Sequence, residues 1–436
     1  MQTRNIIAAL LLGSLSLVSW ADSIKSPMQN TEQVSRRVNA STALTLEDAI
    51  TRTLKNNPQL YQYRFRQQSL VAQRESSSLS PALNLGLEVE NIAGSGEFNG
   101  LDSAETTLAL SSVIELGAKA RSRVAVIDAR TDRLNFERQA TTLDVLGELT
   151  TTFIRSLSTQ ESIALAMEAV ALSEQMLKTV EQRASKGAAP EAEVMRAKAA
   201  HTRTSIRLQA LRSSFKRQKV MLSSFWGSTN PHFTELSGSL SALGSSDDFA
   251  SLLQRAKHSP AIAIFASEAR LKDAEVNLAQ AQSRVDIGWQ LGVRRFEATD
   301  DTALTAGISI PLFSGKRNRG SVASALAERN AVDYQQADAQ LKLHNRLFAA
   351  FSQREENKAA VEQFSTQVLP ALEQALLLTR QAYENGRYRY QDWIAAQEEL
   401  LTAKQQHIEA ATAAQLNQAL IEQLIAEPLA TDDLSY

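Results

Sequence analysis

The sequence predicts a mainly α-helical fold with a small membrane β portion, repeated once along the chain. Glycine and proline are sparse, with 17 and 9 copies among 436 residues, which favours long helices. Four short segments alternate apolar and polar residues, which is typical of strands with one apolar face. Segments roughly 200 residues apart also resemble each other, which indicates a duplicated unit.

The N-terminus has the pattern of a secretory signal peptide over residues 1–21. Arg4 supplies the positive charge, Ile6 to Val18 form an apolar core, and Ser19-Trp20-Ala21 is a small-x-small cleavage site. This core is too short to span a bilayer of about 30 Å, and no other stretch approaches ~20 uninterrupted apolar residues. We therefore expect an exported protein with a flexible segment over 22–43, and any membrane span must consist of strands.

Three matching pairs of segments define the repeat. Pro58 matches Pro260, Gly117 matches Gly315 and Gly187 matches Gly386, at offsets of 202, 198 and 199 residues. The similar offsets predict two units, 44–243 and 249–426, joined by a Ser/Gly-rich loop and followed by a tail over 427–436. Each unit should contain a helix, two strands, a very long helix, a turn and a last helix.

The four strands are expected at about 82–92, 104–115, 285–297 and 302–313. Their lengths are near the roughly 9–11 residues that a membrane strand needs. The same alternation also fits two small hairpins packed on the helices of a soluble protein. The polar faces carry glycine and charge, as suits a wet lumen, and together with the signal peptide they favour a membrane sheet.

The helices are expected to be long and paired. Residues 118–185 contain no proline and would form a helix about 100 Å long. The counterpart over 316–385 contains Pro370, which should bend it or remove a hydrogen bond. Apolar residues at alternating steps of three and four, from Val194 to Leu222 and from Trp393 to Leu424, predict coiled-coil packing.

Four strands cannot close a barrel, so a membrane location requires several chains. An open sheet in lipid leaves edge N–H and C=O groups unpaired, at several kcal/mol each. Backbone chemistry alone allows eight strands from two chains or twelve from three. Side chains largely fill an eight-stranded interior, so a conducting pore favours three chains.

Two motifs make the chain resemble the TolC-like outer membrane factors, and within them the CzcC type that serves heavy-metal efflux pumps. One extends from Glu88 to Gly96 and continues from Glu105 to Arg121; the other, Ile308 to Arg317, is general to the wider family. The resemblance covers about 44–426. It implies an outer-membrane homotrimer with a twelve-stranded β-barrel and a periplasmic α-helical coiled-coil tunnel.

The resemblance also implies a function. The trimer would be the passive exit duct of a tripartite pump, docked to a periplasmic adaptor (membrane fusion protein) and an inner-membrane transporter of the resistance-nodulation-division (RND) class. The CzcC type favours divalent heavy-metal cations as substrates. The alternative is a periplasmic coiled-coil adaptor or scaffold without a membrane span.

The resemblance places a tunnel entrance at the turns of Gly187 and Gly386. Tyr383 matches the family's tip tyrosine, and Asp392 matches an aspartate that lines the closed entrance. Glu193 is the first-repeat counterpart of Asp392. A ring of three Asp392 carboxylates would concentrate cations, whereas a lone aspartate is more often a solvated helix-face acid.

This chain departs from the family pattern at two tip positions. Tyr388 occupies the place of the family's tip arginine, flanked by Arg387 and Arg389, and Ala395 replaces a second aspartate. These departures leave the contacts that close the entrance to be determined.

Six cations, which we call the junction cluster, follow the second strand of each pair. They are Lys119, Arg121, Arg123, Lys316, Arg317 and Arg319. Cations in the first turns of a helix oppose its macrodipole and need compensation. One hypothesis is contact with anionic groups of outer-membrane lipid; simple surface solubility is the alternative.

Composition excludes several other functions. A net charge of −2 disfavours nucleic-acid binding. The absence of cysteine excludes a disulfide, a thiolate nucleophile and a cysteine-type zinc site. The five histidines are isolated, which predicts no metal site, and His201 and His407 lie on the packing seams. We find no catalytic or cofactor-binding motif, so the sequence does not predict an enzyme.

Overall fold

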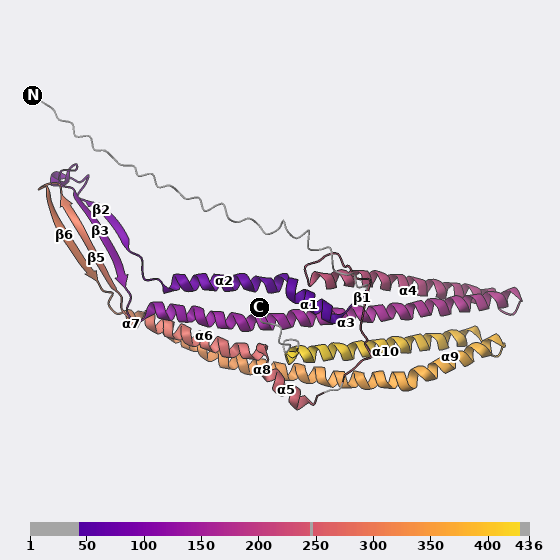
Figure 1. Ribbon diagram of the computed structural model, residues 1–436. Coiled ribbons are helices and arrows are strands. Elements are labelled where there is room, and N and C mark those ends of the chain that lie inside the picture. The colour runs from indigo at the N-terminus through magenta and orange to yellow at the C-terminus, as the bar shows by residue number, and fades with distance from the viewer. Residues whose placement is uncertain (1–42, 245–246, 428–436) are drawn as a thin grey trace, which may run out of the picture. The chain divides into compact units, whose positions relative to one another are not determined.

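The computed structural model describes residues 43–244 and 247–427 (Figure 1). Three expected segments lie outside the described residues: the signal peptide (1–21), the segment 22–43 apart from Ala43, and the tail 427–436 apart from Glu427. Among the described helices, none combines the length and apolar character that a membrane span requires.

The first half of the chain contains the elements of one predicted unit. In order they are β1 (Ala43–Leu44), α1 (Leu46–Asn56), α2 (Pro58–Ser78), β2 (Asn84–Glu90), the short 3-10 helix η1 (Gly96–Phe98), β3 (Glu105–Ile114), α3 (Lys119–Ser185), α4 (Glu191–Ser224) and β4 (Glu235–Leu236). Thr45 caps α1 by accepting a hydrogen bond from the Asp48 amide, and Asn57 caps α2 ahead of Pro58.

The second half follows the same order. It consists of α5 (Phe249–Lys257), α6 (Pro260–Gln282), β5 (Ile287–Phe296), β6 (Asp301–Ser309), α7 (Ser314–Arg317), α8 (Arg319–Gln363), the π-helical turn η2 (Phe364–Val368), α9 (Leu369–Glu384) and α10 (Tyr390–Leu424). Asp248 caps α5, and Pro260 begins α6 as Pro58 begins α2.

The second long helix is interrupted, whereas α3 is continuous over 67 residues. In the π turn the Leu369 amide donates to the Phe364 carbonyl, one residue further back than in an α-helix. Pro370 follows directly and has no amide hydrogen to donate. The interruption therefore lies where the sequence predicted a bend or a lost hydrogen bond.

The four main strands form one antiparallel sheet in the order β2-β3-β5-β6. The central β3–β5 pairing joins the two halves of the chain. Apolar side chains on one face lie opposite one another from strand to strand. The two clearest rows are Leu85, Leu110, Leu291 and Ala306, and Leu87, Leu108, Val293 and Leu304. These leucines and Val293 are exposed, up to 87% for Leu304.

The opposite face of the sheet is polar, and the close approach of its small residues indicates that it is concave. Gly86, Ala109, Gly292 and Thr305 form a row of small residues across all four strands. A Cβ added at Gly292 would lie 3.0 Å from the Ala109 Cβ, whereas directly opposite Cβ atoms ordinarily lie about 4.5–5.5 Å apart. The neighbouring row contains Arg294, which forms ion pairs with Glu90 and Glu105 at 2.9 and 2.8 Å.

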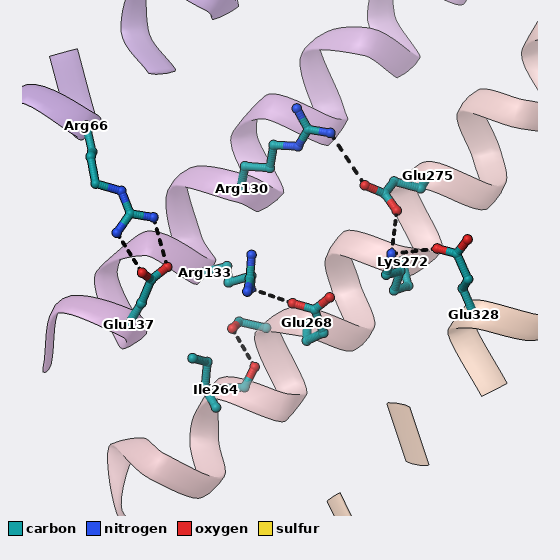
Figure 2. Close-up of polar contacts among 10 residues, drawn as sticks. Arg66, Arg130, Arg133, Glu137, Ile264, Glu268, Lys272, Glu275 and Glu328 are labelled. Atoms are coloured by element: carbon teal, nitrogen blue, oxygen red, sulfur yellow. Dashed lines mark hydrogen bonds and ion pairs between the residues drawn. The ribbon is translucent and has the colours of Figure 1, made fainter. Parts of the chain in front are cut away.

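Four helices lie side by side next to the sheet, in the order α2, α3, α6 and α8 (Figure 1). Helices α2 and α6 lead into β2 and β5, whereas α3 and α8 follow β3 and β6. The helices therefore lie in the same order as the strands. Ion pairs join each neighbouring pair of helices (Figure 2): Arg66–Glu137, Arg130–Glu275, Arg133–Glu268 and Lys272–Glu328. These pairs are partly exposed, so each contributes little to stability and serves mainly to fix the register of the layer.

Buried apolar residues gather in three clusters along the helices. The first surrounds Leu146, Leu149 and Phe153 of α3, where α1, α10 and the short β1–β4 sheet meet. The second joins α5, α8 and α10. The third lies where the α3–α4 and α9–α10 hairpins turn, and it fixes the candidate site.

Candidate functional site at the tips of the helical hairpins

Two turns of the same construction lie at the end of the helices remote from the four-stranded sheet (Figure 1). Gly187 ends α3 with φ +73° and Gly386 ends α9 with φ +75°. In each turn the amide of the residue after the glycine donates a hydrogen bond to the carbonyl five residues earlier. These bonds run from Ala188 to Arg183 and from Arg387 to Ala382, both at 2.8 Å. This pattern requires a left-handed residue, which glycine adopts without strain.

Tyr383 lies buried between the two hairpins. Its ring packs 5.1 Å from the Trp393 ring, and Met176 and Val180 of α3 complete the cluster. Its hydroxyl donates a hydrogen bond to Glu193 Oε2 at 3.3 Å, which connects α9 to the start of α4. Burial, and secondarily the Glu193 charge, raise the pKa of Tyr383 to about 12, so the hydroxyl stays protonated and remains a donor at neutral pH.

Arg183 makes a second connection between the hairpins. Its guanidinium donates to the main-chain carbonyls of Tyr383, at 2.5 Å, and Glu384, at 3.2 Å. It also lies 4.6 Å from the centre of the Tyr383 ring, within cation–π range. A cation is thereby placed at the carboxyl end of α9, where the helix dipole favours it. We call the Arg183 bonds and the Tyr383–Glu193 bond the tip contacts.

From the sequence, Tyr383, Glu193 and both glycines are candidates, and the structure brings them together at the tip; Arg183 is not among those candidates. The acceptors of Arg183 are main-chain carbonyls, which leave no residue pattern to search for. Its position in the last turn of a helix is the one sequence feature that marks it as a partner for carbonyl groups.

Asp392 lies near the tip but takes no part in the tip contacts. Its carboxylate accepts a hydrogen bond from the Arg389 amide at 2.9 Å and so caps α10. The Arg389 amide, and secondarily the Arg389 guanidinium, hold the pKa of Asp392 below its usual range. Arg387 and Tyr388 are exposed on the turn. The structure therefore places an ionised, half-buried acid beside an exposed Arg-Tyr-Arg segment.

The junction cluster divides into two groups. Lys119 is almost buried and pairs with Asp286 at 2.6 Å, while Arg123 binds Glu115 through two hydrogen bonds of 2.6 and 2.9 Å. The other four members, Arg121, Lys316, Arg317 and Arg319, are exposed and form no ion pair with any residue that the structure describes. Protein carboxylates thus compensate two of the six cations.

Neither seam histidine belongs to a metal-binding arrangement. His201 Nδ1 lies 3.2 Å from Ser173 Oγ, and His407 packs against Phe364. Within residues 43–244 and 247–427, no three His, Cys, Asp or Glu side chains are grouped so that they could hold a metal ion.

A concave, polar-faced sheet carried on long paired helices with a packed tip defines the class of TolC-like outer membrane channels. The chain belongs to the outer membrane efflux protein family, whose model matches residues 49–228 and 252–427. This membership places the protein in the outer membrane.

Individual relatives agree with this assignment. The chain is 25% identical over 303 residues to the cobalt-zinc-cadmium resistance protein CzcC of Cupriavidus metallidurans, covering 69% of this chain and 72% of that protein. Its fold matches the crystal structure of CusC with a TM-score of 0.74 at 16% identity, covering 87% of this chain and 91% of the other. It also matches the outer membrane protein VceC of Vibrio cholerae with a TM-score of 0.68 at 20% identity, covering 87% and 95%.

Proposed function

We propose that three copies of this chain form the outer-membrane exit duct of a tripartite efflux pump. The observation that carries the proposal is the sheet. Its convex face is apolar and exposed, its concave face is polar, and within the described residues the outer edges of β2 and β6 pair with no further strand. One chain cannot satisfy these edges in lipid. A ring in which β6 of each copy pairs with β2 of the next satisfies all of them.

The duct is a passive conduit in this proposal. The helices extend into the periplasm, where their tips meet a periplasmic adaptor and an inner-membrane RND transporter that supplies the energy. The chain itself performs no chemistry on the substrate. The two units 44–243 and 249–426 each contribute two strands, so three chains supply the twelve strands that enclose a lumen.

We further propose divalent heavy-metal cations as the substrates. The similarity to a protein named for cobalt, zinc and cadmium resistance supports this choice. A conduit must bind its ion weakly enough to release it. Asp392 from three copies would supply negative charge at the entrance without holding the ion.

The tip contacts keep the entrance closed in this proposal. They join the α3–α4 hairpin to the α9–α10 hairpin within each chain, so the two hairpins can separate only when these contacts break. Gly187 and Gly386 shape the two turns, and Arg387 is exposed for contact with a neighbouring copy or with the adaptor.

Cross-linking tests the ring directly, because the chain contains no cysteine that would interfere. Glu88 on β2 and Ala303 on β6 lie on the same, polar side of the sheet, and a long flexible cross-linker allows for the stagger of strands that a closed barrel requires. With both changed to cysteine, a flexible bismaleimide should yield covalent trimers in outer-membrane fractions. Each single-cysteine variant is the matched control and should yield no trimer. A dimer as the largest product would contradict three copies, and a soluble periplasmic monomer would support the scaffold alternative.

A further inference from the structure

We propose that the segment after β6 is a binding site for anionic phospholipid headgroups in the membrane leaflet that faces the periplasm. The site consists of Leu312, Phe313, Lys316, Arg317 and Arg319. It rests on the proposed placement of the sheet in the membrane, and it adds a lipid requirement that the duct function alone does not imply.

The apolar half of the site continues the lipid-facing side of the sheet. Ile308, Ile310 and Leu312 follow one another at steps of two, so they extend the exposed face to which Leu304 belongs. Leu312 is 70% exposed and Phe313 is 77% exposed. No described helix covers them, and their position at the end of β6 places them where the acyl chains give way to headgroups.

Phe313 adopts an unfavourable backbone conformation. Its φ is +64°, in the left-handed region that glycine and asparagine occupy far more readily than phenylalanine. Its carbonyl accepts hydrogen bonds from the amides of Lys316 and Arg317 at 3.1 and 3.2 Å, which holds the turn that presents these cations. A large apolar residue at such a strained, exposed position points to a role for its side chain outside the chain's own core.

The corresponding segment of the first half has a different backbone, with positive φ at Gly117 and Ala118, and the protein neutralises two of its cations. At the offset of 198 residues, Phe313 corresponds to Glu115 and Arg317 corresponds to Lys119. In the first half, Glu115 binds Arg123 and Asp286 binds Lys119. In the second half the acid is replaced by Phe313, and Lys316, Arg317 and Arg319 form no ion pair within the described residues. The second turn thus exchanges an internal acid for an apolar residue beside three uncompensated cations.

An anionic lipid complements both halves of this site. Its phosphate would pair with the cations, and its acyl chains would contact Leu312 and Phe313. Each lysine or arginine near an anionic surface strengthens binding roughly fivefold, so three of them predict roughly a 100-fold preference over zwitterionic lipid. The competing source of negative charge is Glu75 at the end of α2 in a neighbouring copy, since α2 and α8 form the two edges of the helical layer.

Nanodiscs of defined composition distinguish these two sources. The purified full-length trimer would be placed in phosphatidylcholine alone or in phosphatidylcholine with added phosphatidylglycerol, and lipids retained by the protein would be counted by native mass spectrometry. We expect the preference for phosphatidylglycerol to fall roughly 10- to 100-fold in the triple variant Lys316→Gln, Arg317→Gln, Arg319→Gln. The matched control neutralises three exposed cations of α4, Arg207, Lys216 and Arg217, and should leave the preference unchanged.

A second variant separates lipid binding from folding. Phe313→Asn fits the left-handed backbone and should leave trimer formation intact while it weakens retention of lipid. An unchanged lipid preference in both variants would overturn the proposal. Loss of trimer stability to the same extent in both lipid compositions would assign the cations to the neighbouring copy instead. Failure of the duct proposal would appear separately, as absence of the cross-linked trimer.

Discussion

Replacing Arg183 with alanine is expected to shift the closed entrance toward an open state. The change removes two hydrogen bonds from a charged donor to the carboxyl end of α9, together with the contact over the Tyr383 ring. A hydrogen bond to a charged group contributes about 1.5–3 kcal/mol, and an exposed cation–π contact about 0.5–1 kcal/mol. Because the freed carbonyls can be hydrated, we expect a net loss near 2 kcal/mol per chain, or about a 30-fold shift in the closed-to-open ratio.

Single-channel recording in planar bilayers measures this shift. The open fraction of Arg183→Ala should exceed that of the unchanged protein, and Arg183→Lys should lie between them because one ammonium group cannot reproduce the planar guanidinium contacts. Arg203→Ala is the matched control, since Arg203 of α4 forms an exposed ion pair with Glu398 of α10 between the same two hairpins, and such pairs contribute little. An open fraction equal to that of the control variant would refute the assignment of Arg183 to closure.

Three further predictions concern the tip and the junction. Tyr383→Phe keeps the ring packing but removes the bond to Glu193, so it should raise the open fraction less than Arg183→Ala does, by about 1 kcal/mol in the same recordings. Asp392→Ala should reduce block of the channel by divalent cations. In the unchanged protein, block should persist as the pH falls through the usual aspartate range and disappear only below it, because the pKa of Asp392 is lowered; loss of block at higher pH would count against the ring. Lys119→Ala leaves the half-buried Asp286 without its cation, although the Leu116 amide still donates to it, and should lower the yield of folded trimer by removing about 2 kcal/mol, whereas Lys119→Ala with Asp286→Ala together should recover part of that yield.

Much of the fold follows from local sequence patterns. The alternation of Leu83, Leu85 and Leu87 locates a strand because one apolar face requires a period of two. The glycines of both tip turns mark helix ends because only a left-handed residue completes that hydrogen-bond pattern. β6 ends at Ser309 rather than near 313, shortly before Pro311, which cannot donate to a neighbouring strand.

The contacts of the site were harder to predict because they depend on pairing across the chain. Lys119 meets Asp286, which lies 167 residues away in the sequence, so the junction cluster could not be divided into compensated and uncompensated cations beforehand. Pro370 indicated where the second long helix would be disturbed, but packing determines whether the helix forms a kink or a π turn at that point. Arg183 binds main-chain carbonyl groups, which every residue has, so no residue type in the sequence marks its partners.

The π turn gives the two long helices different mechanical properties. α3 has an uninterrupted ladder of hydrogen bonds over 67 residues, so a displacement of its tip is transmitted along a stiff rod toward the sheet. The other helix contains, between α8 and α9, a wide turn followed by a residue that donates no hydrogen bond. We expect its bending stiffness to be lowest there. A force applied at the Gly386 turn should then be absorbed near residues 364–370 before it reaches the strands beyond α8.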